Sequence, residues 1–202
     1  MWSLIQAAGW PIWPLILASI VALALIFERL WSLRQRVVAP AGLVDQVLGE
    51  YRQAGATPEL LQKTASRGPL GRILAAGLAN VKAPRPVMKE AIEEVGRVVT
   101  HDLERFLTTL GTIAAMAPLL GLLGTVIGMI EIFGSQSSTG SDPIVLARGI
   151  SIALYNTAMG LIVAIPAMIF YRHFRGKVDA LIVEMEQQAI KLVDFAHGYR
   201  KV

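Results

Sequence analysis

Two threonines and an asparagine lie near the middle of apolar stretches of the chain, where their hydrogen-bonding groups could do chemistry. Thr125 lies in "GLLGTVIGMI", and Asn156 and Thr157 lie in "GISIALYNTAMGLIVAIP". These two stretches contain no Asp, Glu, Lys or Arg. A hydroxyl can bind water or solvate a carboxyl group, but it takes up no proton near neutral pH. A proton carried past these residues therefore needs a titratable group from another chain.

Each of the three residues has two interpretations. For Thr125 or Thr157 alone, a hydrogen bond to a carbonyl of its own helix is the simpler one. The two together, on the small-residue faces of neighbouring apolar segments, favour a shared polar lining. We expect Asn156 to bond to a neighbouring helix, because a carboxamide cannot satisfy both of its ends on its own backbone. An ion ligand is the less favoured alternative for Asn156.

The segments that must position these residues are long enough to cross a membrane. Of the 202 residues, 54% are hydrophobic and 17% are charged, which is too apolar for an ordinary soluble domain. A membrane-spanning helix needs roughly 20 apolar residues, and we expect such helices at 10–31, 106–133 and 148–171. The first could instead be a cleaved secretory signal, but it lacks a basic start and ends in "ERLWSLRQR", which favours a retained anchor.

The basic residues predict the orientation of the spans. Lys and Arg follow the first span, precede the second and follow the third, whereas the N-terminal flank and the loop "GSQSSTGSD" carry none. Because cytoplasmic flanks are rich in Lys and Arg, we expect residues 1–9 and the loop 134–147 outside. Residues 32–105 and 172–202 are then expected in the cytoplasm.

The cytoplasmic parts are predicted to be helical. Gly and Pro divide 32–105 into two or three amphipathic helices, and the last of them is expected to continue unbroken into the second span. In 172–202 the apolar residues recur at helical spacing, so this tail is predicted to be an amphipathic helix that extends the third span. Its apolar face must pack against the same chain or another copy. The fold class is thus an all-α membrane protein with three transmembrane helices, two of them extended into the cytoplasm, and a helical cytoplasmic domain.

Composition and motifs argue against several functions. The net charge of +4 gives little support for a nucleic-acid partner. No nucleophile with a base, no Gly-rich phosphate loop and no metal-ligand spacing occurs, so we predict no enzyme activity, no metal and no cofactor. Asp142 lies in the outer loop, and Glu131 and Arg148 lie before and after it. The default interpretation is an interfacial ion pair or solvated charges, and a cation-collecting pore mouth is the alternative.

The stretches "APLLGLLGTVIGMIEIF" and "GISIALYNTAMGLIVAIPAMIFYRHF" resemble the ExbB/TolQ/MotA family of proton-channel motor subunits. The likeness is greatest to the three-span ExbB and TolQ branch, and it extends more loosely to "GPLGRIL" and the C-terminal tail. It implies a multi-pass protein of the bacterial inner membrane, with a periplasmic N-terminus and a cytoplasmic C-terminus. It also implies a homopentamer whose second and third spans line a pore. The expected pore-lining residues are Thr125, Thr157, Gly121, Gly128, Ala153 and Gly160.

The resemblance also implies partners. A single-span protein of the ExbD or TolR type would place its transmembrane aspartate in the pore, and a TonB-like or TolA-like protein would receive the stroke. This chain has Ile152 where several ExbB and TolQ proteins have a glutamate, so a role for that carboxylate is not carried over. The expected function is to energise TonB-dependent outer-membrane transport. The alternatives are a TolQ-like role in envelope integrity and division, or a non-conducting membrane scaffold.

Overall fold

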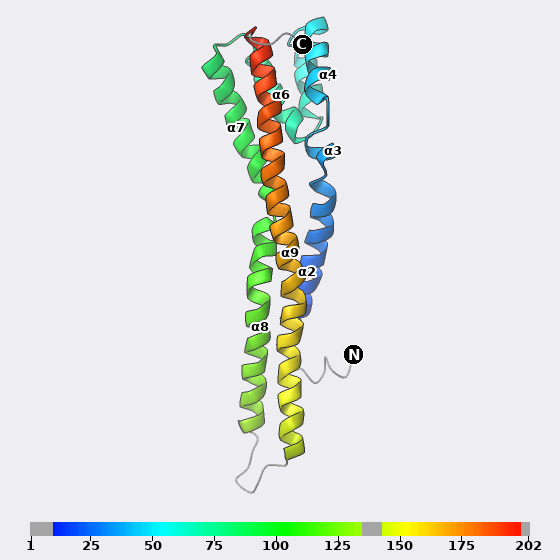
Figure 1. Cartoon of the computed structure of the whole chain (residues 1–202), viewed down its shortest axis with the longest axis vertical. Coiled ribbons are helices and arrows are strands. Elements are labelled where there is room, and N and C mark those ends of the chain that lie inside the picture. Colours follow the sequence, from blue (N-terminus) through cyan, green and yellow to red (C-terminus); the bar gives the residue numbers. More distant parts are fainter. Residues whose placement is uncertain (1–9, 135–142, 199–202) are drawn as a thin grey trace. The chain divides into compact units, whose positions relative to one another are not determined.

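The computed structural model describes residues 10–134 and 143–198, and these are helical with turns and no strand (Figure 1). This agrees with the predicted all-α class. The helices of Figure 1 are α2 (Ile12–Ser32), α3 (Gln35–Val38), α4 (Leu43–Ala54), α5 (Pro58–Ala65), α6 (Pro69–Ala79), α7 (Arg85–Glu104), α8 (Leu107–Gly134) and α9 (Pro143–Ala196).

Three helical segments of the described chain are long and apolar enough to cross a membrane, as predicted. They include α2, α8 and the part of α9 from Gly149 onward. The helices α2 and α8 begin and end within two residues of the predicted spans 10–31 and 106–133. Helix α9 begins earlier than expected, at Pro143, so the end of the predicted loop 134–147 is helical. Proline is common at the first position of a helix, because an N–H group there has no acceptor within the helix and none is lost. Residues 1–9 and 135–142 lie outside the described part.

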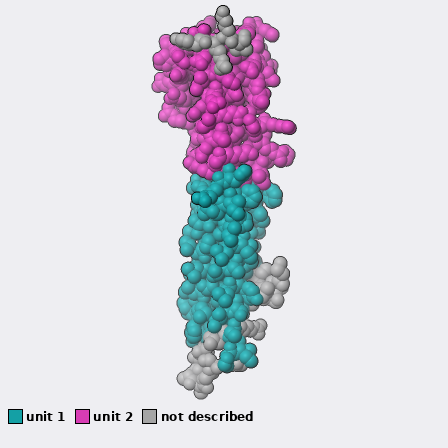
Figure 2. Space-filling model, viewed as in Figure 1, with its two compact units in different colours: residues 1–28, 106–173 teal, residues 29–105, 174–202 magenta. Residues whose placement is uncertain are grey.

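Residues divide into two compact units, which Figure 2 distinguishes by colour. Unit 1 comprises residues 1–28 and 106–173, and it contains most of α2, all of α8 and the first half of α9. Its buried cluster joins Leu15 of α2, Ala117 of α8, and Val163 and Ala164 of α9. Many large apolar side chains of the unit are exposed on the single chain, among them Leu17, Leu119 and Ile162. Such a surface requires lipid or another protein around it.

Unit 2 comprises residues 29–105 and 174–202, and its described part is a helical bundle. The second half of α9 contributes an apolar face to the bundle's core: Phe174, Val178, Leu181, Met185, Ala189, Leu192 and Val193 are buried. Gly77 of α6 lets side chains come close, since a Cβ atom placed on it would lie 2.7 Å from Leu192 and 3.0 Å from Ile92. The apolar face predicted for the C-terminal helix is therefore buried largely within its own chain.

The prediction that the helix before the second span continues unbroken into it is wrong. Helix α7 ends at Glu104 and α8 begins at Leu107. Between them Arg105 is extended, and Phe106 has a φ angle of 65°. A non-glycine residue in the left-handed region is disfavoured, so the break must be stabilised by its surroundings.

One such stabilising contact is a buried arginine at the end of α7. The last four carbonyls of a helix have no partner within the helix. Arg29 of α2 is buried, and its Nη1 donates a hydrogen bond of 3.2 Å to the Leu103 carbonyl. A cation at a helix C-terminus also interacts favourably with the helix dipole. Arg29 thus caps the C-terminal end of α7.

We expect Arg29→Gln to lower the free energy of unfolding by about 1–3 kcal/mol, because the buried Leu103 carbonyl loses its donor. The measurement is thermal or chemical unfolding of the purified chain in detergent. Arg36→Gln is the control, since Arg36 is exposed and should change stability little. Equal losses for both variants would contradict the capping role of Arg29.

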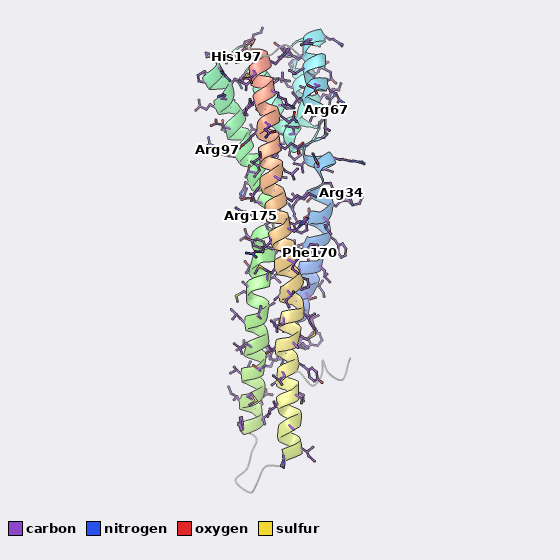
Figure 3. All side chains as sticks on the ribbon, in the orientation of Figure 1. Arg34, Arg67, Arg97, Phe170, Arg175 and His197 are labelled. Carbon is purple, nitrogen blue, oxygen red and sulfur yellow. The ribbon has the colours of Figure 1, made fainter. Side chains whose placement is uncertain are left out.

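Charged side chains around the bundle of unit 2 form ion pairs. Arg67 of the α5 to α6 turn, labelled in Figure 3, lies 2.7 Å from Glu50 of α4, and Lys63 lies 3.1 Å from the same carboxylate. Hydrogen bonds from Arg67, and then from Lys63, hold the pKa of Glu50 below its ordinary value of 4.5. The folded state therefore binds a proton at Glu50 less readily than the unfolded state does.

The ion pairs of Glu50 with Arg67 and Lys63 give unit 2 a stabilisation that depends on pH. Because the pKa of Glu50 is lowered by folding, its contribution is fully present above 4.5 and is lost as the pH falls through the lower folded value. We expect Glu50→Gln to be less stable than the natural chain at neutral pH, and this difference to vanish in acid. Unfolding curves of both proteins from pH 7 to pH 3 test this. A difference that stays constant with pH would contradict it.

Candidate functional site

The spans α8 and α9 meet through glycines whose backbones nearly touch. A Cβ atom placed on Gly121 would lie 2.7 Å from the Asn156 carbonyl oxygen and 3.0 Å from the Thr157 Cα. A Cβ atom placed on Gly160 would lie 2.6 Å from the Ala117 carbonyl oxygen and 3.1 Å from the Gly121 Cα. Contacts under 3.0 Å with backbone cannot be relieved by a side-chain rotation. Only glycine fits at positions 121 and 160 with the helices this close.

Asn156 lies in the same contact. Its side chain is only 1% exposed, and it lies over Gly124 of α8. A Cβ atom placed on Gly124 would lie 2.8 Å from the Asn156 Cβ and 2.9 Å from its Nδ2. The absence of a side chain at Gly124 therefore makes the space for the carboxamide. The structure places Asn156 between the two helices, and its hydrogen bond to a neighbouring helix stays a prediction.

The two threonines differ from Asn156 in being only partly buried. Thr157 follows Asn156, and its backbone lies against Gly121. Thr125 lies four residues after Gly121 on α8, and residues at this spacing share one helix face. The hydroxyl of Thr125 donates a 2.7 Å hydrogen bond to the Leu122 carbonyl. Its hydrogen is thereby engaged with its own helix, and its oxygen remains an acceptor.

The other predicted pore-lining residues divide by burial. Ala153 is 2% exposed and faces Gly128, where an added Cβ would lie 3.3 Å from the Ala153 Cβ. Gly121 and Gly160 are buried between the two helices, whereas Gly128 is partly accessible. A single chain thus brings Gly121, Thr157 and Gly160 together, and it also pairs Gly128 with Ala153. Whether these residues line a pore stays a prediction, since one chain encloses none.

The predicted pore mouth is only partly described. Glu131 is exposed near the end of α8. Asp142 and the side chain of Arg148 lie outside the described part, so their pairing stays a prediction. Ile152, which stands where some relatives have a glutamate, is half-buried on α9. Among the described residues, no three His, Asp or Glu side chains come together as a metal site needs.

Sequence reasoning missed Ala117, and it did not pair Gly124 with Asn156. Ala117 touches the α9 backbone at Gly160 through its carbonyl, and nothing in an alanine's identity signals a carbonyl contact. Gly124 belongs to a GxxxG pattern with Gly128, which did signal close packing. The pattern does not indicate that the residue opposite Gly124 is Asn156.

The site falls within the part of the chain that matches a family model. Residues 65–187 match the model described as the MotA/TolQ/ExbB proton channel family. The chain is 37% identical over 188 residues to the putative biopolymer transport protein ExbB-like 3 of Synechocystis, covering 89% of this chain and 88% of that one. It is 34% identical to the biopolymer transport protein exbB1 of Vibrio cholerae, covering 81% and 74%. It is 28% identical to the Tol-Pal system protein TolQ of Pseudomonas aeruginosa, covering 90% and 86%.

We expect Gly121→Ala and Gly160→Ala to destabilise the contact between α8 and α9 by about 1–3 kcal/mol, as overpacking does. The added methyl would meet backbone atoms in both cases. Gly176→Ala in α9 is the matched control, because nothing lies within 4 Å of its added Cβ. The control should gain up to about 1 kcal/mol from helix propensity. Thermal unfolding in detergent measures all three. Stability gains at positions 121 and 160 would contradict the close contact.

Proposed function

Because this chain belongs to the MotA/TolQ/ExbB proton channel family, we propose that it is the ring-forming subunit of an inner-membrane motor driven by protons. In this proposal five copies surround a pore. A single-span partner of the ExbD or TolR type brings an aspartate into that pore. One observation carries the proposal: two partly accessible hydroxyls lie beside a glycine contact in apolar stretches, Phe106 to Ile130 and Gly149 to Tyr171, that have no Asp, Glu, Lys, Arg or His.

The absence of an acid in these spans makes a partner necessary. A proton relay across a bilayer normally uses Asp, Glu, His, Lys or Arg side chains, and none of these occurs between Phe106 and Ile130 or between Gly149 and Tyr171. Isolated charge in the bilayer is costly. Hydroxyls lower that cost by hydrogen bonding to a carboxyl group or to the water around it. The proposed role of Thr125 and Thr157 is therefore to solvate the partner's aspartate.

The hydrogen bond of Thr125 determines whether its hydroxyl can donate or accept a further hydrogen bond. Its hydrogen is held by the Leu122 carbonyl, 2.7 Å away, so its oxygen accepts a further hydrogen bond from water or from a protonated carboxyl. To bind an ionised carboxylate directly, Thr125 must first release Leu122. Proton uptake by the aspartate thus changes whether it can hydrogen-bond to Thr125 directly. In the proposed cycle, this difference lets the partner's helix move to a new position in the ring.

The names of the relatives favour one task for the motor. The two relatives above 30% identity cited here are named for biopolymer transport, and the TolQ relative is 28% identical. We therefore propose that the motor energises TonB-dependent outer-membrane transport through a TonB-like protein. A TolQ-like role with a TolA-like protein is the second candidate. The basic residues after α2 and around 172–177 support a periplasmic N-terminus and a cytoplasmic C-terminus.

We expect Thr157→Val to reduce proton uptake at least roughly tenfold in vesicles that contain this chain and its single-span partner, since a hydrogen bond to a charged group is lost. Valine keeps the shape and removes the hydroxyl. Thr112→Val is the matched control. Thr112 lies on α8 and bonds the Thr108 carbonyl at 2.9 Å, but it is exposed and lies outside the glycine contact. Its replacement should leave uptake unchanged.

Two results would contradict the proposal. Unchanged uptake in Thr157→Val would remove the pore role of that hydroxyl. A chain that is monomeric or dimeric with its partner, with no central opening and no proton uptake, would favour the non-conducting scaffold instead. Size measurement and electron microscopy of the same preparation distinguish these cases.

A further inference from the structure

Exposed aromatic and basic residues lie along the chain where α2 ends. We call Trp31, Arg34, Arg36 and Val37 the α2 corner. The exposed fraction is 67% for Trp31 and 46% for Val37, and both arginines are exposed. The candidate membrane span ends at Ser32, so these residues lie at the depth of lipid headgroups if α2 crosses the bilayer. Indole rings favour that zone.

The arginines of the α2 corner have no acidic partner in the described part of the chain. The guanidinium carbon of Arg34, labelled in Figure 3, lies 4.2 Å from the centre of the Trp31 ring. No ion pair of Arg34 or Arg36 occurs there, whereas Arg67, Arg72, Arg85 and Arg175 each pair with a carboxylate. A guanidinium stacked on an indole still has N–H groups for an oxyanion, and the stacking holds it in place.

We propose that the α2 corner binds the phosphate of an anionic phospholipid headgroup. Two unpaired guanidinium groups supply the positive charge, and arginine matches phosphate oxygens in geometry. The exposed Trp31 and Val37 offer apolar surface that the acyl chains of a lipid can contact and a free phosphate ion cannot. The inference rests on the proposed membrane placement of α2, but it does not depend on proton transport.

The test is a titration of the full-length chain in detergent with phosphatidylglycerol or phosphatidylcholine, with bound lipid counted by native mass spectrometry. The natural chain should bind phosphatidylglycerol more tightly. Each basic residue near a membrane surface contributes about fivefold to such binding. The double variant Arg34→Gln, Arg36→Gln should therefore lose roughly 25-fold in affinity for phosphatidylglycerol and little for phosphatidylcholine.

A matched double variant, Arg52→Gln with Lys89→Gln, removes the same charge elsewhere. Arg52 also lies over an aromatic ring, 5.0 Å from the centre of Phe195, but it belongs to α4 and not to the end of a span. This control should bind phosphatidylglycerol as the natural chain does. The variant Arg34→Lys, Arg36→Lys keeps the charge but loses the planar guanidinium, so its affinity for phosphatidylglycerol should lie between those of the natural chain and the Gln variant.

Three outcomes would overturn the proposal. The first is an equal loss in the matched control, which would mean that net charge alone sets the affinity. The second is no preference for phosphatidylglycerol in the natural chain. The third is removal of the preference by inorganic phosphate at matched ionic strength, which would assign the site to a free ion. Proton uptake in phosphatidylcholine vesicles tests the motor separately, so failure of one proposal is distinguishable from failure of the other.

Discussion

The structure of unit 1 depends on the close approach of two helices at Gly121 and Gly160. Between helices in lipid no water is released, so association relies on close packing and hydrogen bonds. Each of these glycines lies against the backbone of the opposite helix, as the short distances from their added Cβ atoms show. Such a contact allows little rotation of one helix about its axis. It therefore fixes which residues face the partner helix and which remain accessible.

The division between Asn156 and Thr157 follows from this constraint. The two residues are adjacent in sequence, but Asn156 is almost fully buried over Gly124, and Thr157 is partly accessible. A buried carboxamide between two helices adds hydrogen-bonding capacity to a contact that is otherwise apolar. A partly accessible hydroxyl can meet something that comes from outside the chain. One glycine contact thus separates a residue suited to holding the helices from a residue suited to binding.

The features that the sequence predicted are those set by composition and by the helical spacing of apolar and small residues. The apolar length of α2, α8 and α9 predicted the spans, and the small residues predicted a close contact. The break at Phe106 could not be predicted, because phenylalanine carries no signal for a positive φ angle. Its stabilisation comes in part from Arg29, 74 residues before Leu103 in the chain. The sequence alone assigns that arginine only to a basic flank.

The proposed role of Thr125 belongs to its position and not to its residue type. Thr112 lies on the same helix and also donates its hydroxyl hydrogen to a carbonyl one turn back. Thr112 is exposed next to Gly111, whose own contact is the ring of Tyr171. Thr125 instead follows Gly124 and shares a helix face with Gly121, the two glycines that receive Asn156 and Thr157. In the proposed role, an acid that approaches the accessible edge of this contact meets the hydroxyls of Thr125 and Thr157, one from each span.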